Sequence, residues 1–348
     1  MHYQILDGGA LREWREFVER CPMATEDHLV FDLGHPSSSQ CSRVLVAREN
    51  GRITSGAHVI MRKNKLVPGC VLRIEGGALY DRLIDANELD ALLDAVCNAF
   101  GDEHPIFVEW SLRLPRVIES TEVPEHRFIT EWMEKRKLLP RPELEATFWV
   151  DLSGTEDELA ERTHKNFRRD FRKAEREGVT VRQVGSERID RFYDMSQEMD
   201  RIKSLGSTYF RLATREQFTS FVGGLLNDGA AALFAAEWQG SIRNMALVTT
   251  VGTPRYKYGA TGAEARGDVR PPPTGQLLHW EIMKWLRSQS AVRYDLGGTP
   301  GRELAADHPN FGVWQFKRRM GGQYIEFFTR SRLVRRPLLM KLYQKMRG

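Results

Sequence analysis

The chain has 348 residues and a net charge of only +4, and 41% of its residues are hydrophobic and 28% charged, which is typical of a globular protein with about two domains. No run of about 18 apolar residues occurs, which excludes a membrane-spanning helix, and the first residues lack the pattern of a signal peptide. We therefore expect a cytoplasmic protein. The cysteines at positions 21, 41, 70 and 97 match no zinc-ligand spacing, so we predict reduced thiols and no metal site.

The first half of the chain predicts three strands, a helix and a fourth strand. Residues 44–53 form two strand-like segments around a tight turn at Gly51, and residues 71–77 give a further strand. An amphipathic helix is expected over residues 86–100 and a short apolar strand over residues 106–110.

A strongly basic helix is predicted over residues 155–178. Phe167, Phe171 and Ala174 recur at helical spacing and give it an inward face. Between positions 162 and 178, seven lysines and arginines accompany only three acids. Such a helix can pair its cations with its own acids, but the surplus favours a phosphate-rich partner such as RNA. The candidate tRNA-binding residues are Lys165, Arg168, Arg169, Arg172 and Lys173.

The order of the first half returns in the second half, over residues 235–242, 256–260, 275–289 and 292–296. Four positions match in register between the halves, namely Ala47 with Ala236, Gly51 with Gly240, Ile53 with Ile242 and Ala57 with Ala246. Although such an arrangement also arises by chance, the matches favour a duplication. We predict an α/β protein with mixed sheets and two similar domains, residues 1–145 and 146–348.

Each predicted unit resembles the fold of the GNAT N-acetyltransferases, which bind the pyrophosphate of coenzyme A on backbone N–H groups at a helix N-terminus. The corresponding loop of the second half is Arg270-Pro-Pro-Pro-Thr-Gly275, and proline has no N–H. The first half has Asp85 there, and its carboxylate repels a pyrophosphate. We therefore expect no coenzyme A site of the usual kind, and no cofactor.

One lysine near the C-terminus stands among apolar residues. Tyr294-Asp295-Leu-Gly-Gly predicts a short buried strand and a glycine-rich loop, and Lys317 then follows Trp314 and Phe316. Most lysines in such a place extend their ammonium group into water. The alternative is a cation in an active site.

The last residues form a basic tail that includes Arg330, Arg332, Arg335, Arg336, Lys341, Lys345 and Arg347. On one interpretation this tail extends the RNA-binding patch. Leu338, Leu339, Leu342 and Tyr343 also give it an apolar face, which suits peripheral contact with an anionic membrane.

These motifs together resemble the Fem family of peptidyltransferases, which transfer an amino acid from aminoacyl-tRNA to peptidoglycan precursors. The resemblance covers nearly the whole chain and rests on five segments, the helix 166–179, Tyr256-x-Tyr258-Gly-Ala, Leu277-Leu-x-Trp280-Glu, Tyr294-Asp-Leu-Gly-Gly and Phe316-Lys317 with Gly321. It implies two tandem GNAT-like domains without a working coenzyme A site. The long coiled-coil arm of some members is not expected, because no heptads occur between residues 178 and 229.

The resemblance also assigns roles to residues of the second domain. Lys317 matches the lysine of the catalytic site, with Phe316 in the wall of the cleft. Tyr256 matches an aromatic residue that contacts the acceptor, and Tyr258 belongs to the same motif.

Other positions depart from the family. Arg201 matches an arginine that helps to bind the phosphate groups of the acceptor, but Leu205 stands where a tyrosine follows it, and Tyr209 comes later. Residues 32–36 replace an early Gln…Trp signature. These departures leave open a natural-product pathway, in which related proteins aminoacylate a small amine or peptide.

The resulting hypothesis is an enzyme that uses aminoacyl-tRNA as co-substrate and an amine-bearing peptide or muropeptide as acceptor. Lys317 would stabilise the oxyanion, and Asp295 or the tRNA hydroxyl would take the proton; we interpret Glu109 as structural. One alternative is an acyl-CoA-dependent N-acyltransferase. A second is a non-enzymatic module that binds RNA or a membrane.

Overall fold

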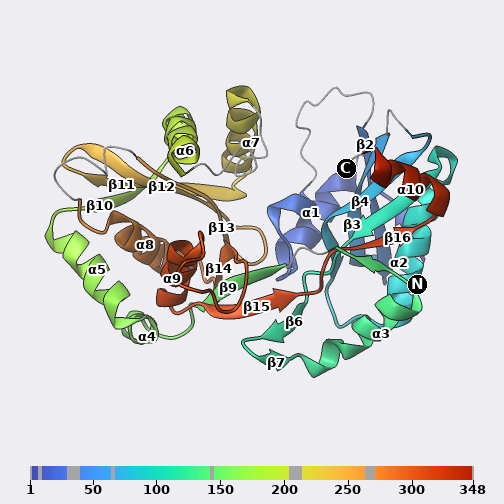
Figure 1. Ribbon diagram of the computed structural model, residues 1–348, viewed down its shortest axis with the longest axis horizontal. Helices are drawn as coiled ribbons and strands as arrows, with labels where there is room; N and C mark the ends of the chain where they lie inside the picture. Colours follow the sequence, from blue (N-terminus) through green and yellow to red (C-terminus); the bar gives the residue numbers. More distant parts are fainter. Residues whose placement is uncertain are drawn as a thin grey trace. The chain divides into compact units, whose positions relative to one another are not determined.

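The computed structural model of this protein describes residues 2–6, 10–29, 40–63, 67–141, 145–203, 214–262 and 271–346 (Figure 1). The chain forms two compact units. Unit 1 comprises residues 1–146 and 325–348, and unit 2 comprises residues 147–324. Within these described ranges no helix is long and apolar enough to cross a membrane.

Unit 1 is built on a seven-stranded sheet in the order β1-β2-β3-β4-β5-β16-β8. Its strands are β1 (Tyr3–Ile5), β2 (Gln40–Glu49), β3 (Arg52–Lys63), β4 (Cys70–Tyr80), β5 (Pro105–Trp110), β16 (Ser331–Val334) and β8 (Leu139–Pro140). All the neighbouring strands run antiparallel except β4 and β5, which are parallel. A smaller ribbon joins β6 (Pro115–Ile118) to β7 (Thr121–Glu122) and to the end of β15 (Gln323–Phe327).

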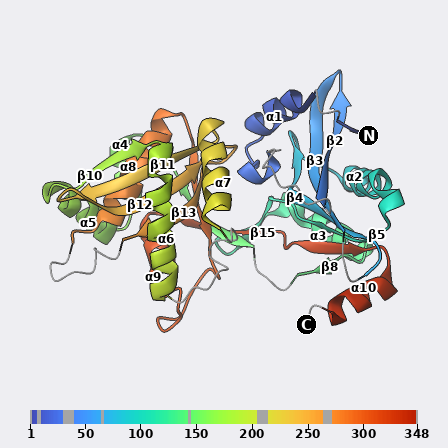
Figure 2. The same ribbon diagram turned by 90° about the horizontal axis from the view of Figure 1, so that it is seen from above.

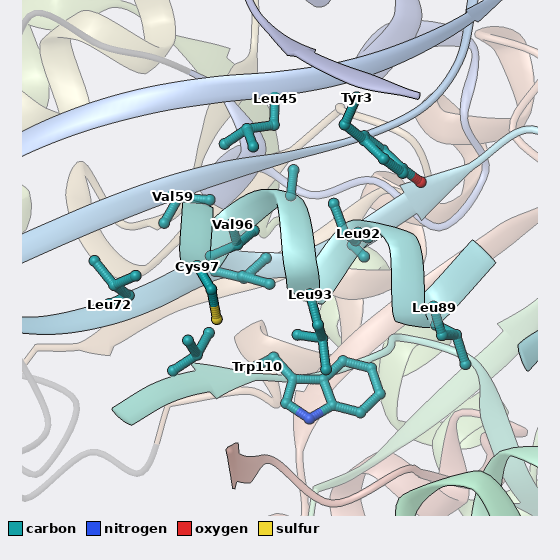
Figure 3. Close-up of a cluster of buried hydrophobic side chains, with 14 of the residues drawn as sticks. Tyr3, Leu45, Val59, Leu72, Leu89, Leu92, Leu93, Val96, Cys97 and Trp110 are labelled. Carbon is teal, nitrogen blue, oxygen red and sulfur yellow. The ribbon is translucent and has the colours of Figure 1, made fainter. Parts of the chain in front are cut away.

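The helices of unit 1 are α1 (Leu11–Arg20), α2 (Ala86–Ala99), α3 (Arg127–Lys135) and α10 (Pro337–Lys345), with short 3-10 turns at 26–28, 101–103 and 124–126. Apolar residues of α2 pack on the sheet and form the core shown in Figure 3. Leu92, Leu93 and Val96 from α2 meet Leu72 of β4 and Trp110 of β5 there. Burial of these apolar side chains makes the main favourable contribution to the folding free energy of the unit.

Unit 2 contains a sheet in the order β10-β11-β12-β13-β14-β9. Its strands are β9 (Ala146–Asp151), β10 (Thr180–Val184), β11 (Ala231–Trp238), β12 (Ser241–Thr249), β13 (Arg255–Thr261) and β14 (Arg293–Gly298). Its helices are α4 (Glu156–Arg162), α5 (Lys165–Arg176), α6 (Ile189–Lys203), α7 (Arg215–Asn227), α8 (Thr274–Ser288) and α9 (Phe311–Arg319), with a 3-10 turn at 186–188.

The helices of unit 2 cover both faces of this sheet. Figures 1 and 2 show α6 and α7 on one side of β11–β13 and α5 and α8 on the other. On the second side, Phe171 of α5 stacks on Trp280 of α8 with ring centroids 4.5 Å apart, and Trp285 of α8 contacts Phe234 of β11. Each helix therefore buries one apolar stripe against the sheet or its neighbour.

The predicted repeat is present. Both units contain three antiparallel strands, a helix and a strand parallel to the third, as β2-β3-β4-α2-β5 and β11-β12-β13-α8-β14. Both first hairpins turn through two residues with positive φ, Asn50-Gly51 and Gln239-Gly240, as expected of a two-residue hairpin turn. The predicted fold class, two tandem GNAT-like domains, is therefore confirmed. The longest helices of the described segments have 15 residues, so these segments contain no coiled-coil arm.

Two details differ from the prediction. Residues 325–348 belong to unit 1 rather than to the second domain, because β16 pairs with β5. The basic helix 155–178 is two helices, since Thr163 and His164 both have extended backbones. The N–H of His164 donates to the carbonyl of Arg319 at 2.9 Å, so the break is stabilised by a tertiary contact.

Candidate active site

Lys317 lies buried in unit 2, near the end of α9, with 7% of its surface exposed. Its Nζ donates to the carbonyl oxygens of Gly297 at 3.1 Å and Gly298 at 2.7 Å. An ammonium group has three N–H donors, so these two bonds leave one donor for another acceptor. The lysine does not extend into water, and the simple surface interpretation does not hold.

Lys317 is held by the irregular end of β14 around Gly297, the Gly297 loop, which is fixed by Asp295 on the same strand. Oδ1 of Asp295 accepts from the N–H of Gly297 at 2.8 Å and from the hydroxyl of Thr147 on β9. The same hydroxyl lies 2.9 Å from the carbonyl oxygen of Gly297. Gly297 has φ +76°, and a Cβ there would lie 3.0 Å from the carbonyl oxygen of Tyr256. Only glycine adopts this conformation without strain. This backbone conformation and the hydrogen bonds to Asp295 and Thr147 place the carbonyls of Gly297 and Gly298 against the ammonium group of Lys317.

The two charged residues near Lys317 shift its pKa in opposite directions. Burial lowers the pKa of Lys317 to about 8, Asp295 raises it, and Arg255 lowers it. Roughly nine in ten of the side chains are still charged at pH 7 with such a pKa. Asp295 and Arg255 lie in register on β14 and β13 and form the one register pair of these parallel strands.

His279 on α8 completes the buried cluster. Its Nδ1 lies 3.2 Å from the hydroxyl of Tyr294, and its ring contacts those of Tyr256 and Phe316, with centroids 4.7 and 5.3 Å apart. Burial and, to a smaller extent, the charge of Lys317 lower the pKa of His279 to about 3, so it is neutral at pH 7. Sequence reasoning missed His279, because one histidine in an apolar helix carries no distinctive pattern.

The structure brings Tyr256 and Phe316 to Lys317 but separates Tyr258 from them. Tyr256 packs on His279 of α8, whereas Tyr258 contacts Phe218 of α7 on the other face of the sheet. The ladder between β12 and β13 shifts register between these two tyrosines. A bulge of this kind reverses the side on which the following residues point, so the shared motif does not make a shared site.

The remaining acceptor-binding predictions are not joined to this cluster. Arg201 is exposed on α6. Tyr209 and Leu205 lie outside the described residues, as do Arg270 and positions 32–36. In the part of the chain that the structure describes, no group of three or more His, Cys, Asp or Glu side chains is arranged to hold a metal ion.

The basic helix α5 divides into structural and exposed cations. Nη1 of Arg168 donates to the carbonyl oxygens of Ala160 and Thr163 at 2.8 and 2.5 Å and to that of Glu161 at 2.9 Å. Arg168 therefore caps the end of α4, whereas its contact with tRNA stays a prediction.

The other candidates on α5 are exposed. Arg169 pairs with Asp170 at 2.8 Å and Lys173 with Glu177 at 3.7 Å, and such surface pairs are weak and exchangeable. Lys165 and Arg172 make no ion pair with any described residue. The exposed side of α5 thus keeps a positive surplus.

Neither helix that could hold the pyrophosphate of coenzyme A fits that group. At α8, Pro271, Pro272 and Pro273 offer no N–H, and the N–H groups of Thr274 and Gln276 already donate to proline carbonyls at 2.7 and 3.2 Å. At α2, the carboxylate of Asp85 accepts from the N–H of Glu88 at 2.9 Å, and the carboxylate of Glu88 accepts from that of Asp85 at 3.0 Å. The first site is therefore poor in free N–H donors, and the second carries two carboxylates.

The counterpart of Asp295 in unit 1 is Glu109 on β5, which is in register with Arg73 on β4. Four arginines surround its buried carboxylate, Arg73 at 3.9 Å, Arg141 at 3.3 Å, Arg330 at 3.5 Å and Arg332 at 3.2 Å. This arrangement agrees with the structural role expected for Glu109. It also shows that the first arginines of the tail, Arg330 and Arg332, are bound to Glu109 in unit 1.

Comparison with known proteins agrees with this geometry. Residues 161–318 match the acetyltransferase (GNAT) domain family. The structure is similar to the crystal structure of FemX over 98% of this chain and 99% of that one, with a TM-score of 0.82 and 16% identity. The chain has the Fem fold. The predicted resemblance to the Fem family is thereby confirmed in the fold, while 16% identity leaves the substrates undecided.

Two other solved structures share the fold more distantly. A tandem GNAT protein from the clavulanic acid biosynthesis pathway, solved without acetyl-CoA, aligns over 95% of this chain and 98% of its own, with a TM-score of 0.50 and 12% identity. A conserved protein of unknown function from Bacteroides thetaiotaomicron aligns over 94% and 99%, with a TM-score of 0.52 and 9% identity. No curated protein sequence matches this chain. Together the findings support an acyltransferase of the Fem or GNAT type.

Proposed function

We propose that this protein is an aminoacyltransferase that moves an amino acid from aminoacyl-tRNA to the amine of a peptide acceptor and forms an amide bond. The observation that carries the proposal is the buried Lys317, which is held by two backbone carbonyls and keeps one N–H donor. A fixed, desolvated cation of this kind is suited to an oxyanion that forms during acyl transfer.

The choice of tRNA over coenzyme A rests on the helix ends and on α5. The N-terminus of α8 is poor in free N–H donors, because three prolines precede it and two of its N–H groups bond to proline carbonyls, and the N-terminus of α2 carries Asp85 and Glu88. The exposed cations of α5 suit a polyphosphate donor instead. We therefore assign the donor role to aminoacyl-tRNA rather than to acyl-CoA.

The reaction needs no covalent enzyme intermediate, because the aminoacyl ester is already activated. The acceptor nitrogen attacks the ester carbonyl, the C–N bond forms, and the negative charge that develops on oxygen is stabilised by the free N–H of Lys317. Collapse breaks the C–O bond to the terminal ribose, whose hydroxyl oxygen takes a proton from the acceptor nitrogen. Positioning the two substrates supplies a large part of the rate enhancement.

Asp295 acts in this scheme by position and charge. Its Oδ1 already accepts two hydrogen bonds inside the protein, which fits holding the Gly297 loop and keeping Lys317 charged. Tyr256 and Phe316, which share contacts with His279, form the apolar surroundings of the lysine. The low dielectric of such surroundings strengthens the interaction between the ammonium and the oxyanion.

The proposal is tested by incubating the protein with labelled aminoacyl-tRNA or acyl-CoA, together with small peptides that carry a free amine. We expect transfer from aminoacyl-tRNA that ribonuclease abolishes. Transfer from acyl-CoA alone would contradict the proposal and favour the rival N-acyltransferase. Binding of RNA without any transfer would favour a non-enzymatic module.

A pair of variants then tests the site. Lys317→Met keeps the length of the side chain without its charge, and we expect transfer to fall about 100-fold or more. Lys284→Met on α8 removes a half-exposed lysine that pairs with Glu281 and serves as the matched control, with a normal rate expected. A normal rate in folded Lys317→Met protein would remove Lys317 from the mechanism.

A further inference from the structure

The C-terminal helix α10 has one face bound to unit 1 and another that is exposed and apolar. Met340 and Tyr343 are buried, and the ring of Tyr343 meets that of Phe107 on β5 with centroids 5.4 Å apart. Figure 2 shows α10 beside this strand. These contacts fix the rotation of the helix about its axis, and the side away from Met340 and Tyr343 is exposed.

That outward side carries an apolar stripe. Leu338, Leu342 and Met346 are 81%, 43% and 44% exposed, and they follow one another at intervals of four residues, which places them along one side of a helix. Other exposed apolar residues of this unit, such as Leu83 and Ile5, are isolated from one another in sequence. Single exposed apolar residues are ordinary, whereas an aligned stripe indicates a contact surface.

Cations border the stripe and no acid accompanies it. Lys341 and Lys345 are exposed within the helix, and Arg335 and Arg336 are exposed just before it. From residue 329 to residue 348 the sequence contains seven lysines and arginines and no Asp or Glu. Arg330 and Arg332 are held by Glu109, so the cations near the stripe are those of α10 and of the residues that lead into it.

We propose that α10 is a docking surface for an anionic lipid bilayer. Exposed leucines bordered by lysines match an interfacial helix, which buries its apolar side at the level of the acyl chains while its cations meet anionic headgroups. The helix is already folded on unit 1, so binding does not have to order it. This inference does not depend on the acyl donor or the acceptor of the proposed reaction.

Two other occupants fit less well. A second copy of the chain would bring two sets of like charges together, and three apolar residues cover far less than the roughly 1,200 Å² of a small stable interface. RNA would use the cations, but its phosphates leave the exposed leucines without a partner. The combination of leucines and cations favours lipid.

The test is cosedimentation of the full chain with vesicles of phosphatidylcholine alone or with 30% phosphatidylserine. We expect binding to the anionic vesicles only, with weaker binding at 0.5 M salt because screening shortens the range of the charges. Leu338→Glu with Leu342→Glu should weaken binding by about 100-fold, from about tenfold for each leucine. Lys341→Gln with Lys345→Gln removes two charges and should weaken binding by about 25-fold, from about fivefold for each charge.

Controls distinguish the helix from the rest of the surface. Leu83→Glu and Lys135→Glu change exposed residues of unit 1 outside α10 and should bind like the unchanged protein, and thermal unfolding verifies that each variant is folded. Failure of the unchanged protein to bind, or equal binding of the α10 variants, would overturn the proposal. A dimer in sedimentation experiments that Leu338→Glu dissociates would also overturn it. The same holds if the lysine variant loses affinity for tRNA but still binds the vesicles.

Discussion

The two units place an arginine and a carboxylate in register at the same point of the fold but surround them differently. In each unit an arginine on the third strand is in register with a carboxylate on the parallel fourth strand, Arg73 with Glu109 and Arg255 with Asp295. In unit 1 the carboxylate is surrounded by four arginines. In unit 2 it binds a hydroxyl and a backbone N–H and lies near one buried lysine.

This difference shows that the fold alone does not make the site. The strand order and the register are shared, but the side chains and backbone groups around the carboxylate decide whether it joins a network of salt bridges or supports a single buried cation. The Gly297 loop makes the difference, because its carbonyls accept hydrogen bonds from Lys317. Its left-handed φ is one that glycine adopts without strain and that other residues do not.

The largest expected effect concerns unit 1. Glu109→Gln leaves four guanidinium groups without their carboxylate, so we expect a loss of about 3 kcal/mol in the free energy of unfolding, measured by urea denaturation. Glu326→Gln, in the same unit, removes a carboxylate that pairs with Arg116 and should cost less than about 1 kcal/mol. The rate of transfer per folded Glu109→Gln molecule should be unchanged; a large fall would place Glu109 in the chemistry and end the contrast between the units.

The next effect concerns one buried histidine in each unit. Burial lowers the pKa of His28 to about 4 and that of His279 to about 3, from 6.5. Below pH 6.5 the unfolded chain binds protons that the folded chain does not, so stability is fully present above pH 6.5 and is lost as the pH falls. Each histidine should cost about 2 kcal/mol between pH 6.5 and pH 5.

Denaturation at the two pH values checks this, with His28→Gln and His279→Gln as the variants. Each substitution should make the loss between pH 6.5 and pH 5 about 2 kcal/mol smaller than in the unchanged protein. The difference between the two pH values isolates the titration from the packing cost of the substitution. An equal loss in variant and parent would show that the histidine is not kept neutral.

A smaller effect tests how Asp295 and Arg255 in unit 2 set the pKa of Lys317. If protonated Lys317 is required, transfer should decline as the pH rises through about 8, where its pKa lies. Asp295 raises that pKa and Arg255 lowers it, so Asp295→Asn should move the decline to lower pH and Arg255→Gln to higher pH, each by about one unit. Single-turnover rates from pH 6.5 to pH 9.5 measure both shifts. Declines at one common pH in all three proteins would contradict the role of the lysine.

The smallest effect separates two arginines of α5. Arg172→Gln should weaken tRNA binding a few-fold and reduce the slope of log affinity against log salt by about 1, as for one phosphate contact. Arg168→Gln should leave that slope unchanged and reduce stability by about 1–2 kcal/mol, because three carbonyl oxygens lose their donor. Equal slopes for Arg172→Gln and the parent would direct the search for the tRNA surface away from α5.

Sequence patterns predicted those features that depend on neighbouring residues. The repeated strands and helices follow from apolar periodicity, and the paired hairpins follow from turn residues such as Gly51 and Gly240. The tyrosine motif shows the limit of such patterns. Tyr256 and Tyr258 are two residues apart, which puts them on one side of a regular strand, but the register shift between β12 and β13 separates them. A bulge depends on the partner strand and is therefore invisible in the motif.

The sequence by itself determined the two-fold repeat, the resemblance to the Fem family and the choice of Lys317 as a candidate, because these are written in local composition and in the order of motifs. The tertiary structure decided that Lys317 is buried against Gly297 and Gly298, that His279 joins it, that Arg168 caps a helix and that the tail belongs to unit 1. Each of these depends on contacts between distant positions. Their free energy comes from desolvation and hydrogen bonds that exist only after folding.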